Sequence, residues 1–187
     1  SRFIPAFATT TVAERTGTGT EISVVPARRQ IQIKDLLTHT SGMSYGTETH
    51  IAKFYQEKGL GPAAGIGWYF ADKTEPVCAS IERLATLPFI SHPGDAYVYG
   101  YSTDVLGCVV ERASGMSLDE FVRTRITAPL GMSDTHFYLP TAKRDRLAVV
   151  YGTAPGGGIT RAEPGPRGQG AYVDGPRVSY SGGAGLL

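Results

Sequence analysis

The sequence predicts an α+β fold in which a helical lobe is followed by extended, glycine-rich segments. Two observations predict this class. From about residue 31 to residue 130, apolar side chains recur at the three- and four-residue spacing of helices, in five short blocks. From residue 131 to residue 187 this spacing is lost, and glycine and proline divide the chain into loops and short extended runs. At 187 residues, the chain is long enough for one sizeable core, or for one domain plus part of another.

Each of the five predicted helices combines an apolar stripe with a capping residue or a helix breaker. A serine or threonine that can cap a helix stands at the start of four of them, and glycine or proline follows the end of each. The run Ser-Leu-Asp-Glu at residues 117–120 is a capping box. In chain order, the predicted helices lie at residues 34–40, 48–58, 75–87, 102–114 and 118–128.

The chain from residue 131 to residue 187 is predicted to be extended or irregular. Residues 135–139 and 147–151 are rich in aromatic and aliphatic side chains, which favours two short strands or extended runs. Beyond Gly152, Pro-Gly-Gly-Gly at residues 155–158 and Pro-Gly-Pro at residues 164–166 cannot sustain a helix. We expect loops there, with room for one strand.

The charge balance argues against two classes of partner. Lysine and arginine total 18 against 17 aspartate and glutamate residues, and the charges are dispersed along the chain. Neither a nucleic acid nor an anionic membrane surface is therefore predicted as a partner. No apolar run approaches the roughly 20 residues of a membrane span. The composition fits an enzyme that acts on a small molecule.

The two cysteines, Cys78 and Cys108, fall on the apolar faces of the third and fourth predicted helices. Free cysteine is among the most buried residue types, and two cysteines without evidence of secretion do not make a disulfide framework. We therefore expect two buried free thiols, with a disulfide as the less favoured alternative.

Several sequence runs carry a resemblance to one enzyme group. The most specific are Ile-Lys-Asp-Leu-Leu-Thr-His-Thr-Ser-Gly-Met at residues 33–43 and Tyr-Gly-Tyr-Ser-Thr-Asp-Val-Leu-Gly at residues 99–107. His-Pro-Gly at residues 92–94, Pro-Leu-Gly-Met at residues 129–132 and Ser-Gly-Gly-Ala-Gly-Leu at residues 181–186 keep the same order. The chain resembles β-lactamase-related serine hydrolases, which include class C β-lactamases, family VIII esterases and penicillin-binding proteins. The resemblance implies a β-lactamase/transpeptidase-like fold, of which this chain supplies mainly the helical lobe and its connections to the mixed α/β lobe.

The resemblance also implies a catalytic residue, Tyr99. In this family, Ser-x-x-Lys, a tyrosine motif and Lys-Thr-Gly or His-x-Gly surround a cleft, and only the tyrosine motif is present here. A phenol has a pKa of about 10 and is a poor base in water, but a neighbouring ammonium favours its phenolate. Tyr99 is then expected to take the proton of the nucleophilic serine and return it to the leaving group. Tyr101 is a second candidate for this role, and the spacing of the motif favours Tyr99. The alternative interpretation is that Tyr97, Tyr99 and Tyr101 form one packed face.

Two further aromatic residues are predicted to contact the substrate. β-Lactamase and peptidase members usually have asparagine two residues after the motif tyrosine, where this chain has Tyr101. A phenol cannot reproduce the donors and acceptor of a carboxamide, so an ester is favoured over a β-lactam, and an amide is the other expected class of small-molecule substrate. Trp68 could line a substrate pocket together with Tyr69 and Phe70, although a small buried aromatic cluster is the favoured interpretation of these three residues.

No Ser-x-x-Lys occurs anywhere in the 187 residues. We therefore expect that the chain is an internal fragment of a serine hydrolase that forms an acyl-enzyme, and that the nucleophile lies upstream. By itself the fragment is expected to be inactive and to expose apolar surface where the sheet lobe packs.

Three rival hypotheses are less favoured by the sequence. Gly-Met-Ser-Tyr-Gly at residues 42–46 matches the nucleophile elbow of α/β-hydrolases, but the elbow needs a strand before Ser44, and a helix is predicted there. A non-catalytic relative could keep the lobe as a binding module. A metal site is not predicted, because the four histidines are scattered and the cysteines are not paired in spacing. No cofactor is expected, and His39 is expected to be structural.

Overall fold

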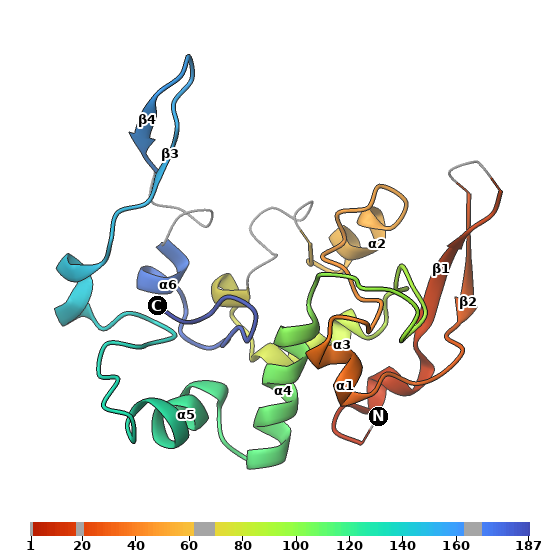
Figure 1. Cartoon of the computed structure of the whole chain (residues 1–187), viewed down its shortest axis with the longest axis horizontal. Helices are drawn as coiled ribbons and strands as arrows, with labels where there is room; N and C mark the ends of the chain where they lie inside the picture. Colours follow the sequence, from red (N-terminus) through yellow and green to blue (C-terminus); the bar gives the residue numbers. More distant parts are fainter. Residues whose placement is uncertain (1, 18–20, 62–69, 163–169) are drawn as a thin grey trace.

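Helix α4 (Ser102–Ser114) lies at the centre of the structure, a computed structural model that describes residues 2–17, 21–61, 70–162 and 170–187. The elements before α4 lie mostly on one side of it, and those after α5 lie on the other (Figure 1). Helices and two small antiparallel sheets, β1-β2 and β3-β4, are both present, as predicted for the α+β class. The helices and strands are η1 (Pro5–Thr9), β1 (Thr11–Arg15), β2 (Ile22–Pro26), α1 (Ile33–Leu37), α2 (Ala52–Glu57), η3 (Phe70–Asp72), α3 (Val77–Leu84), α4, α5 (Leu118–Val122), η4 (Arg123–Thr127), η5 (Thr141–Arg146), β3 (Tyr151–Thr153), β4 (Ile159–Arg161) and α6 (Gly170–Asp174).

The five predicted helices are present as α1 to α5, although most are shorter than expected. Gly115 ends α4 in a left-handed conformation, and the Ser117 hydroxyl accepts a hydrogen bond from the backbone N–H of Glu120 at 3.2 Å. Helix α1 ends earlier than predicted. Its C-cap is Thr38, because His39 already adopts a left-handed backbone conformation with φ of 53°.

The hairpin of β1 and β2 was not predicted. Val12 and Ala13 are adjacent in β1 and are both buried, so this strand lacks the period-two alternation that marks a half-buried strand. Both residues are covered because β1 also bonds to Phe89. The Ala13 N–H donates to the Phe89 carbonyl at 2.8 Å, and the Phe89 N–H donates to the Thr11 carbonyl at 2.9 Å. This bridge anchors the chain just before the loop that leads to α4.

The C-terminal part differs from the prediction in two places. Residues 135–139 form no strand. His136 exchanges backbone hydrogen bonds of 3.2 and 2.8 Å with Leu187, and the Leu139 N–H donates to the Tyr172 carbonyl at 3.0 Å. The predicted run 147–151 becomes a strand only from Tyr151. The glycine-rich turn at residues 156–158 joins β3 to β4, so glycines that were expected to make loops close a hairpin. Helix α6 was not predicted.

The core has two parts. The larger part packs around the rings of Tyr55, Phe70, Phe89 and Tyr101, and it joins β1 to α1, α2, α3 and α4. The smaller part consists of Leu118, Phe137 and Tyr138, with Tyr172 and Tyr180 packed against it.

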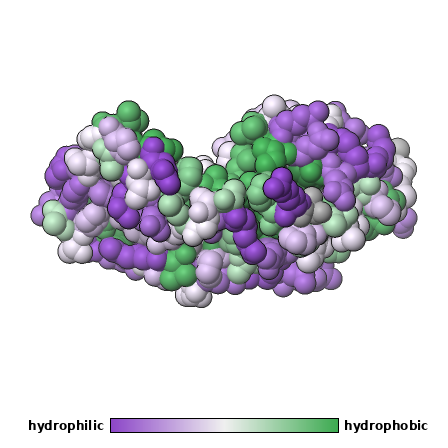
Figure 2. All heavy atoms as spheres, turned by 90° about the horizontal axis from the view of Figure 1, so that it is seen from below, coloured by the Kyte–Doolittle hydropathy of each residue, from purple (hydrophilic) through white to green (hydrophobic). Residues whose placement is uncertain are grey.

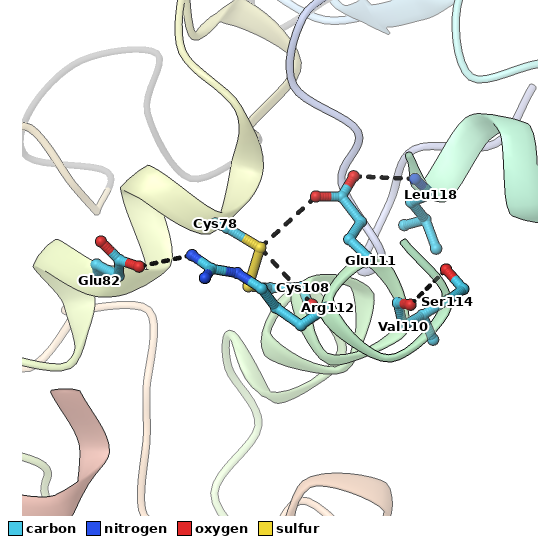
Figure 3. The surroundings of a disulfide bond; sticks show 8 residues. All are labelled: Cys78, Glu82, Cys108, Val110, Glu111, Arg112, Ser114 and Leu118. Carbon is cyan, nitrogen blue, oxygen red and sulfur yellow. Dashed lines mark hydrogen bonds and ion pairs between the residues drawn. A yellow bond between two sulfur atoms is a disulfide. The ribbon is translucent and has the colours of Figure 1, made fainter. Parts of the chain in front are cut away.

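The expectation of free thiols was wrong, because Cys78 and Cys108 form a disulfide (Figure 3). It joins α3 to α4, whose Cα atoms at these residues are 5.1 Å apart, within the range that a disulfide spans. Beside it, the Glu111 carboxylate accepts a hydrogen bond from the Leu118 N–H at 2.9 Å, at the start of α5. The sequence places both cysteines on apolar helix faces, but only the packing of α3 on α4 brings these faces together.

Two apolar grooves flank α4. Phe3, Ile33 and Val109 help to line the first, between α4, α1 and the N-terminal segment. Leu106 and Phe137 help to line the second, between α4, α5 and the C-terminal segment. Figure 2 shows apolar surface gathered around the hollow between the two halves of the molecule. Among the described residues, none of the helices has the length and apolar character needed to cross a lipid bilayer.

Candidate active site

Two loops that are about 60 residues apart in the sequence lie side by side and form the candidate site. One is the segment after α1, residues 38–46, and the other is the tyrosine loop, residues 95–101. The Val98 N–H donates to the His39 carbonyl at 2.7 Å, and the Gly94 N–H donates to the Thr40 carbonyl at 2.7 Å. The hydroxyls of Ser41 and Ser102 are 2.9 Å apart, which ties the segment after α1 to the first turn of α4.

Glycine at two positions allows this close approach. A Cβ atom on Gly100 would lie 2.4 Å from the Met43 carbonyl oxygen, and one on Gly42 would lie 1.9 Å from the Ser91 carbonyl oxygen. Gly42 also has a φ of 85°, a conformation that residues with a side chain rarely adopt. Gly100 therefore allows the tyrosine loop to lie against Met43 and Ser44, and Gly42 allows the segment after α1 to lie against Ser91.

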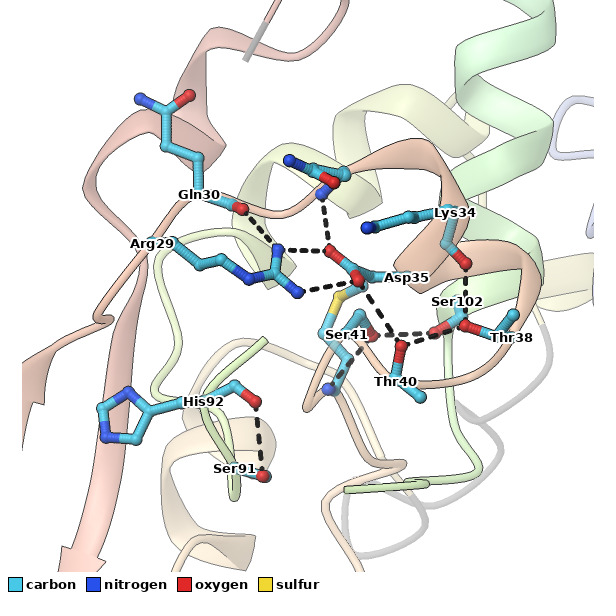
Figure 4. Close-up of polar contacts among 12 residues, drawn as sticks. Arg29, Gln30, Lys34, Asp35, Thr38, Thr40, Ser41, Ser91, His92 and Ser102 are labelled. Atoms are coloured by element: carbon cyan, nitrogen blue, oxygen red, sulfur yellow. Dashed lines mark hydrogen bonds and ion pairs between the residues drawn. The ribbon is translucent and has the colours of Figure 1, made fainter. Parts of the chain in front are cut away.

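An ion pair at the start of α1 supports the same region (Figure 4). The Arg29 guanidinium donates two hydrogen bonds to the Asp35 carboxylate, at 2.6 and 2.9 Å, and these bonds hold the pKa of Asp35 below its usual range. A Cβ atom on Gly94 would lie 2.3 Å from an Arg29 nitrogen. Arg29 thus contacts both α1 and the turn before the tyrosine loop, a link that no sequence pattern indicated.

Tyr99 is exposed and is packed between two aromatic rings. Its side chain is 60% exposed, and its ring centroid lies 4.9 Å from that of His39 and 5.7 Å from that of Tyr45. The Nδ1 atom of His39 is buried and makes no hydrogen bond within the described part of the chain. Tyr97 is 69% exposed and also packs on His39, at 5.9 Å. The three tyrosines of the loop therefore do not form one packed face.

Tyr101 points into the core instead. It is fully buried, its ring lies 4.8 Å from that of Tyr45, and its hydroxyl accepts a hydrogen bond from the Gly61 N–H at 3.0 Å. Burial raises the pKa of Tyr101, so its hydroxyl stays protonated. Of the two candidates for the catalytic tyrosine, Tyr99 is thus the exposed one and Tyr101 the buried one. In this geometry Tyr101 supports the loop from beneath, and its contact with a substrate stays a prediction. Trp68 lies outside the described residues.

Ser44 does not have the surroundings of a nucleophile elbow. Helix α1, not a strand, precedes its loop, and its side chain is buried. Its hydroxyl donates to the Glu48 carboxylate at 2.7 Å and accepts from the Gly46 N–H at 3.0 Å. These contacts fix the turn of residues 44–48, as expected for an ordinary loop serine.

Asp104 connects the first turn of α4 to the C-terminal segment. Its Oδ1 accepts hydrogen bonds from the Ser181 hydroxyl at 2.6 Å and from the Gly183 N–H at 3.1 Å. Burial raises the pKa of the Asp104 carboxyl to about 6. Sequence reasoning missed this residue, because its partners are almost 80 residues away.

We expect wild-type stability to fall, relative to an Asp104→Asn variant, as the pH rises from about 4 to about 6. The folded chain keeps the Asp104 proton up to about pH 6, whereas an unfolded chain releases it near pH 4. The proton on Asp104 therefore stabilises the folded state by about 2–3 kcal/mol below about pH 4, and this stabilisation is lost as the pH rises to about 6. Asparagine keeps an acceptor oxygen for Ser181 and Gly183. Urea unfolding of both proteins at several pH values measures the difference, and parallel curves would contradict the expectation.

Comparison with known proteins gives consistent results. The family model described as Beta-lactamase matches residues 23–187. Esterase EstB from Burkholderia gladioli is 35% identical over 121 residues, which are 65% of this chain and 29% of that protein. Acyltransferase mokF from Monascus pilosus is 31% identical over 139 residues, 74% of this chain and 30% of that protein. The structure of simvastatin synthase LovD from Aspergillus terreus matches with a TM-score of 0.71 and 25% identity, covering 99% of this chain and 42% of that one.

The chain thus spans less than a third of the length of these two curated relatives, which are an esterase and an acyltransferase. The structural match confirms the predicted β-lactamase/transpeptidase-like fold. The family match extends from β2 to the last residue and includes both loops of the candidate site. This chain therefore belongs to the β-lactamase family, and its fold is that of the β-lactamase-related serine hydrolases.

Proposed function

We propose that this chain carries the catalytic tyrosine of a serine hydrolase, and that the whole protein cleaves or transfers the acyl group of a small ester through an acyl-enzyme. The observation that carries the proposal is the position of Tyr99. Its ring is fixed between His39 and Tyr45, while its side chain remains largely exposed. A fixed but accessible phenol is what proton transfer to and from a bound substrate requires.

The proposed reaction has two stages. A serine from a Ser-x-x-Lys motif, which residues 1–187 do not contain, attacks the ester carbonyl. As the bond to carbon forms, the serine proton passes to the phenolate oxygen of Tyr99, which the lysine ammonium stabilises. As the ester C–O bond breaks, Tyr99 returns the proton to the leaving alcohol. In the second stage, water or an alcohol attacks the acyl-enzyme and gives its proton to Tyr99. Tyr99 returns a proton to the serine oxygen as the acyl-enzyme bond breaks, and the result is hydrolysis or acyl transfer.

Three further parts of the proposal come from the sequence. We assign residues 31–130 to the helical lobe of the complete domain and residues 131–187 to the segments that return to its sheet lobe. We also place Trp68 at the substrate pocket. An ester is preferred over a β-lactam, because Tyr101 occupies the position where β-lactam-hydrolysing members usually have asparagine. The esterase and acyltransferase names of two relatives support this preference.

Replacing Tyr99 by phenylalanine in the whole protein is expected to lower kcat for hydrolysis of p-nitrophenyl butyrate about a hundredfold, since general acid–base catalysis contributes at least this much. Phenylalanine keeps the ring that packs on His39, so the melting temperature should stay the same. Tyr97→Phe is the matched control, because it removes a second exposed hydroxyl from the same loop.

The outcomes separate the hypotheses. Equal loss in both variants, or no loss in Tyr99→Phe, would reject Tyr99 as the catalytic tyrosine. A wild-type protein with no activity on esters, amides or nitrocefin would favour the non-catalytic binding module. Adding a primary alcohol to the assay and measuring the new ester distinguishes acyl transfer from hydrolysis.

A further inference from the structure

His39 ends helix α1 in a backbone conformation that glycine usually supplies. Beyond the C-cap residue, the His39 N–H donates to the Leu36 carbonyl at 3.4 Å. The next N–H, that of Thr40, donates to the Asp35 carbonyl at 2.8 Å. These two bonds form a Schellman motif, in which the residue after the C-cap is left-handed and is usually glycine. His39 adopts this conformation with a φ of 53°, which strains a residue that has a Cβ atom.

Helix α2 has the unstrained form of the same ending. Its residue after the C-cap is Gly59, which has a φ of 65° and donates to the Gln56 carbonyl at 3.0 Å. The Leu60 N–H then donates to the Tyr55 carbonyl at 2.9 Å. The hydrogen bonds at the two helix ends are equivalent, so closing α1 does not require histidine. A strained residue of this kind persists where the surrounding structure holds it, commonly at a functional site.

The tyrosine loop contacts both the backbone and the side chain of His39. The His39 carbonyl accepts a hydrogen bond at 2.7 Å from the N–H of Val98, the residue before Tyr99. The imidazole ring packs on the Tyr99 ring, with centroids 4.9 Å apart and planes inclined by 39°. Most of the Tyr99 side chain is exposed, so its orientation depends on the ring contacts on its covered side. The left-handed backbone sets the direction of the His39 carbonyl and of its side chain, and both then meet the loop.

We propose that His39 is a positioning residue for Tyr99: its imidazole supports the phenol ring, and the strained end of α1 is retained because it places the imidazole there. This inference rests on the proposed function of Tyr99. A phenol that passes a proton from the serine to the leaving alcohol must stay within hydrogen-bond reach of both oxygens. Rotation of the ring away from His39 would move the hydroxyl out of this position. Loss of the imidazole should therefore slow the reaction and leave the fold intact.

The variant His39→Gly separates positioning from a role in ending the helix, because glycine relieves the strain and removes the ring. In the whole protein, we expect kcat for p-nitrophenyl butyrate to fall about tenfold and KM to change by less than about twofold, since a misplaced proton-transfer group mainly slows the chemical step. The melting temperature should fall by no more than about 3 °C, because the relieved strain offsets the lost ring contact. Full activity in this variant would overturn the proposal.

Two other variants complete the comparison. His39→Asn keeps a residue type that tolerates the left-handed conformation but lacks the ring, so it should lose kcat as His39→Gly does. Gly59→His introduces the same strain at the end of α2, where no atom of the described residues lies within 4 Å of an added Cβ atom. It should lower the melting temperature and leave kcat unchanged. An equal loss of kcat in Gly59→His and His39→Gly would mean that activity does not depend on the imidazole, and would reject the proposal.

NMR tests the support of the Tyr99 ring without any need for activity. With 3-fluorotyrosine at position 99 of the whole protein, we expect the 19F resonance in His39→Gly to move toward its position in urea-unfolded protein. In Gly59→His it should not move. An unmoved resonance in His39→Gly would show that His39 does not hold the ring, and the proposal would fail.

A double-mutant cycle tests whether His39 acts through Tyr99. In a Tyr99→Phe background, His39→Gly should lower kcat no further, because the hydroxyl that the imidazole positions is gone. Additive losses would mean that His39 acts independently of Tyr99, against the proposal. A wild-type protein without activity would reject the proposed function alone, and the 19F comparison would still decide whether His39 holds the Tyr99 ring.

Discussion

Replacing Gly42 by alanine is expected to lower the free energy of unfolding by about 2–5 kcal/mol. Two costs combine at this position. The φ of 85° strains any residue that has a Cβ atom, which costs roughly 1–2 kcal/mol. The added methyl group would also lie 1.9 Å from the Ser91 carbonyl oxygen, so the backbone of one loop has to move, which costs about 1–3 kcal/mol more.

The control for this prediction is Gly59→Ala. Gly59 has a similar φ, 65°, but no atom lies within 4 Å of the position that an added methyl group would occupy, so only the backbone strain remains. We expect a loss of about 1 kcal/mol there. Denaturation of both variants in guanidinium chloride compares the two costs. Equal losses would mean that residues 42 and 91 do not approach each other as closely as described.

Loss of the disulfide is the second large effect. Replacing both Cys78 and Cys108 by serine is expected to destabilise the fold by about 3–4 kcal/mol, because the bond closes a loop with a sequence separation of 30 and restricts the unfolded chain. The serine hydroxyls would add to the loss, since both positions are buried between α3 and α4.

Reductant provides the internal comparison for this prediction. Wild-type protein in dithiothreitol should approach the stability of the double serine variant, and the double variant itself should not respond to dithiothreitol. A wild-type unfolding curve that is the same with and without reductant, under conditions that reduce the unfolded chain, would contradict the presence of a stabilising disulfide. Mass spectrometry of the alkylated protein verifies the redox state of both samples.

The helices were predictable because their signals are local. The apolar stripe of α4 and the glycine at residue 115 lie within a single stretch of chain, and so does the cap at Ser117. The end of α1 was harder. His39 adopts a left-handed conformation that its residue type does not demand, and its carbonyl is then placed to accept a hydrogen bond from Val98, far along the chain. The cause is tertiary, so the sequence pattern pointed to Gly42 instead.

The candidate site shows the same difference between features with local sequence signals and features with tertiary causes. The tyrosine motif identified Tyr99 and Tyr101 together, and the spacing favoured Tyr99. Only the structure distinguishes their environments, with one side chain exposed and the other fully buried. The packing of Tyr45 on Tyr99 was not predicted, because the two residues are 54 positions apart in the sequence. The close approach at Gly100 would have been the available signal, but glycine in a loop has many other causes.

The sequence alone determined the family, the α+β class, the order of the five helices and the tyrosine that the motif contains, because each depends on residue types at fixed spacing. The tertiary structure decided which tyrosine is exposed, that Cys78 and Cys108 are bonded, that β1 pairs with Phe89 and that Asp104 binds the C-terminal segment. Each of these depends on which distant segments share a surface. Packing and burial over the whole core determine which segments are in contact, and no local sequence pattern predicts this.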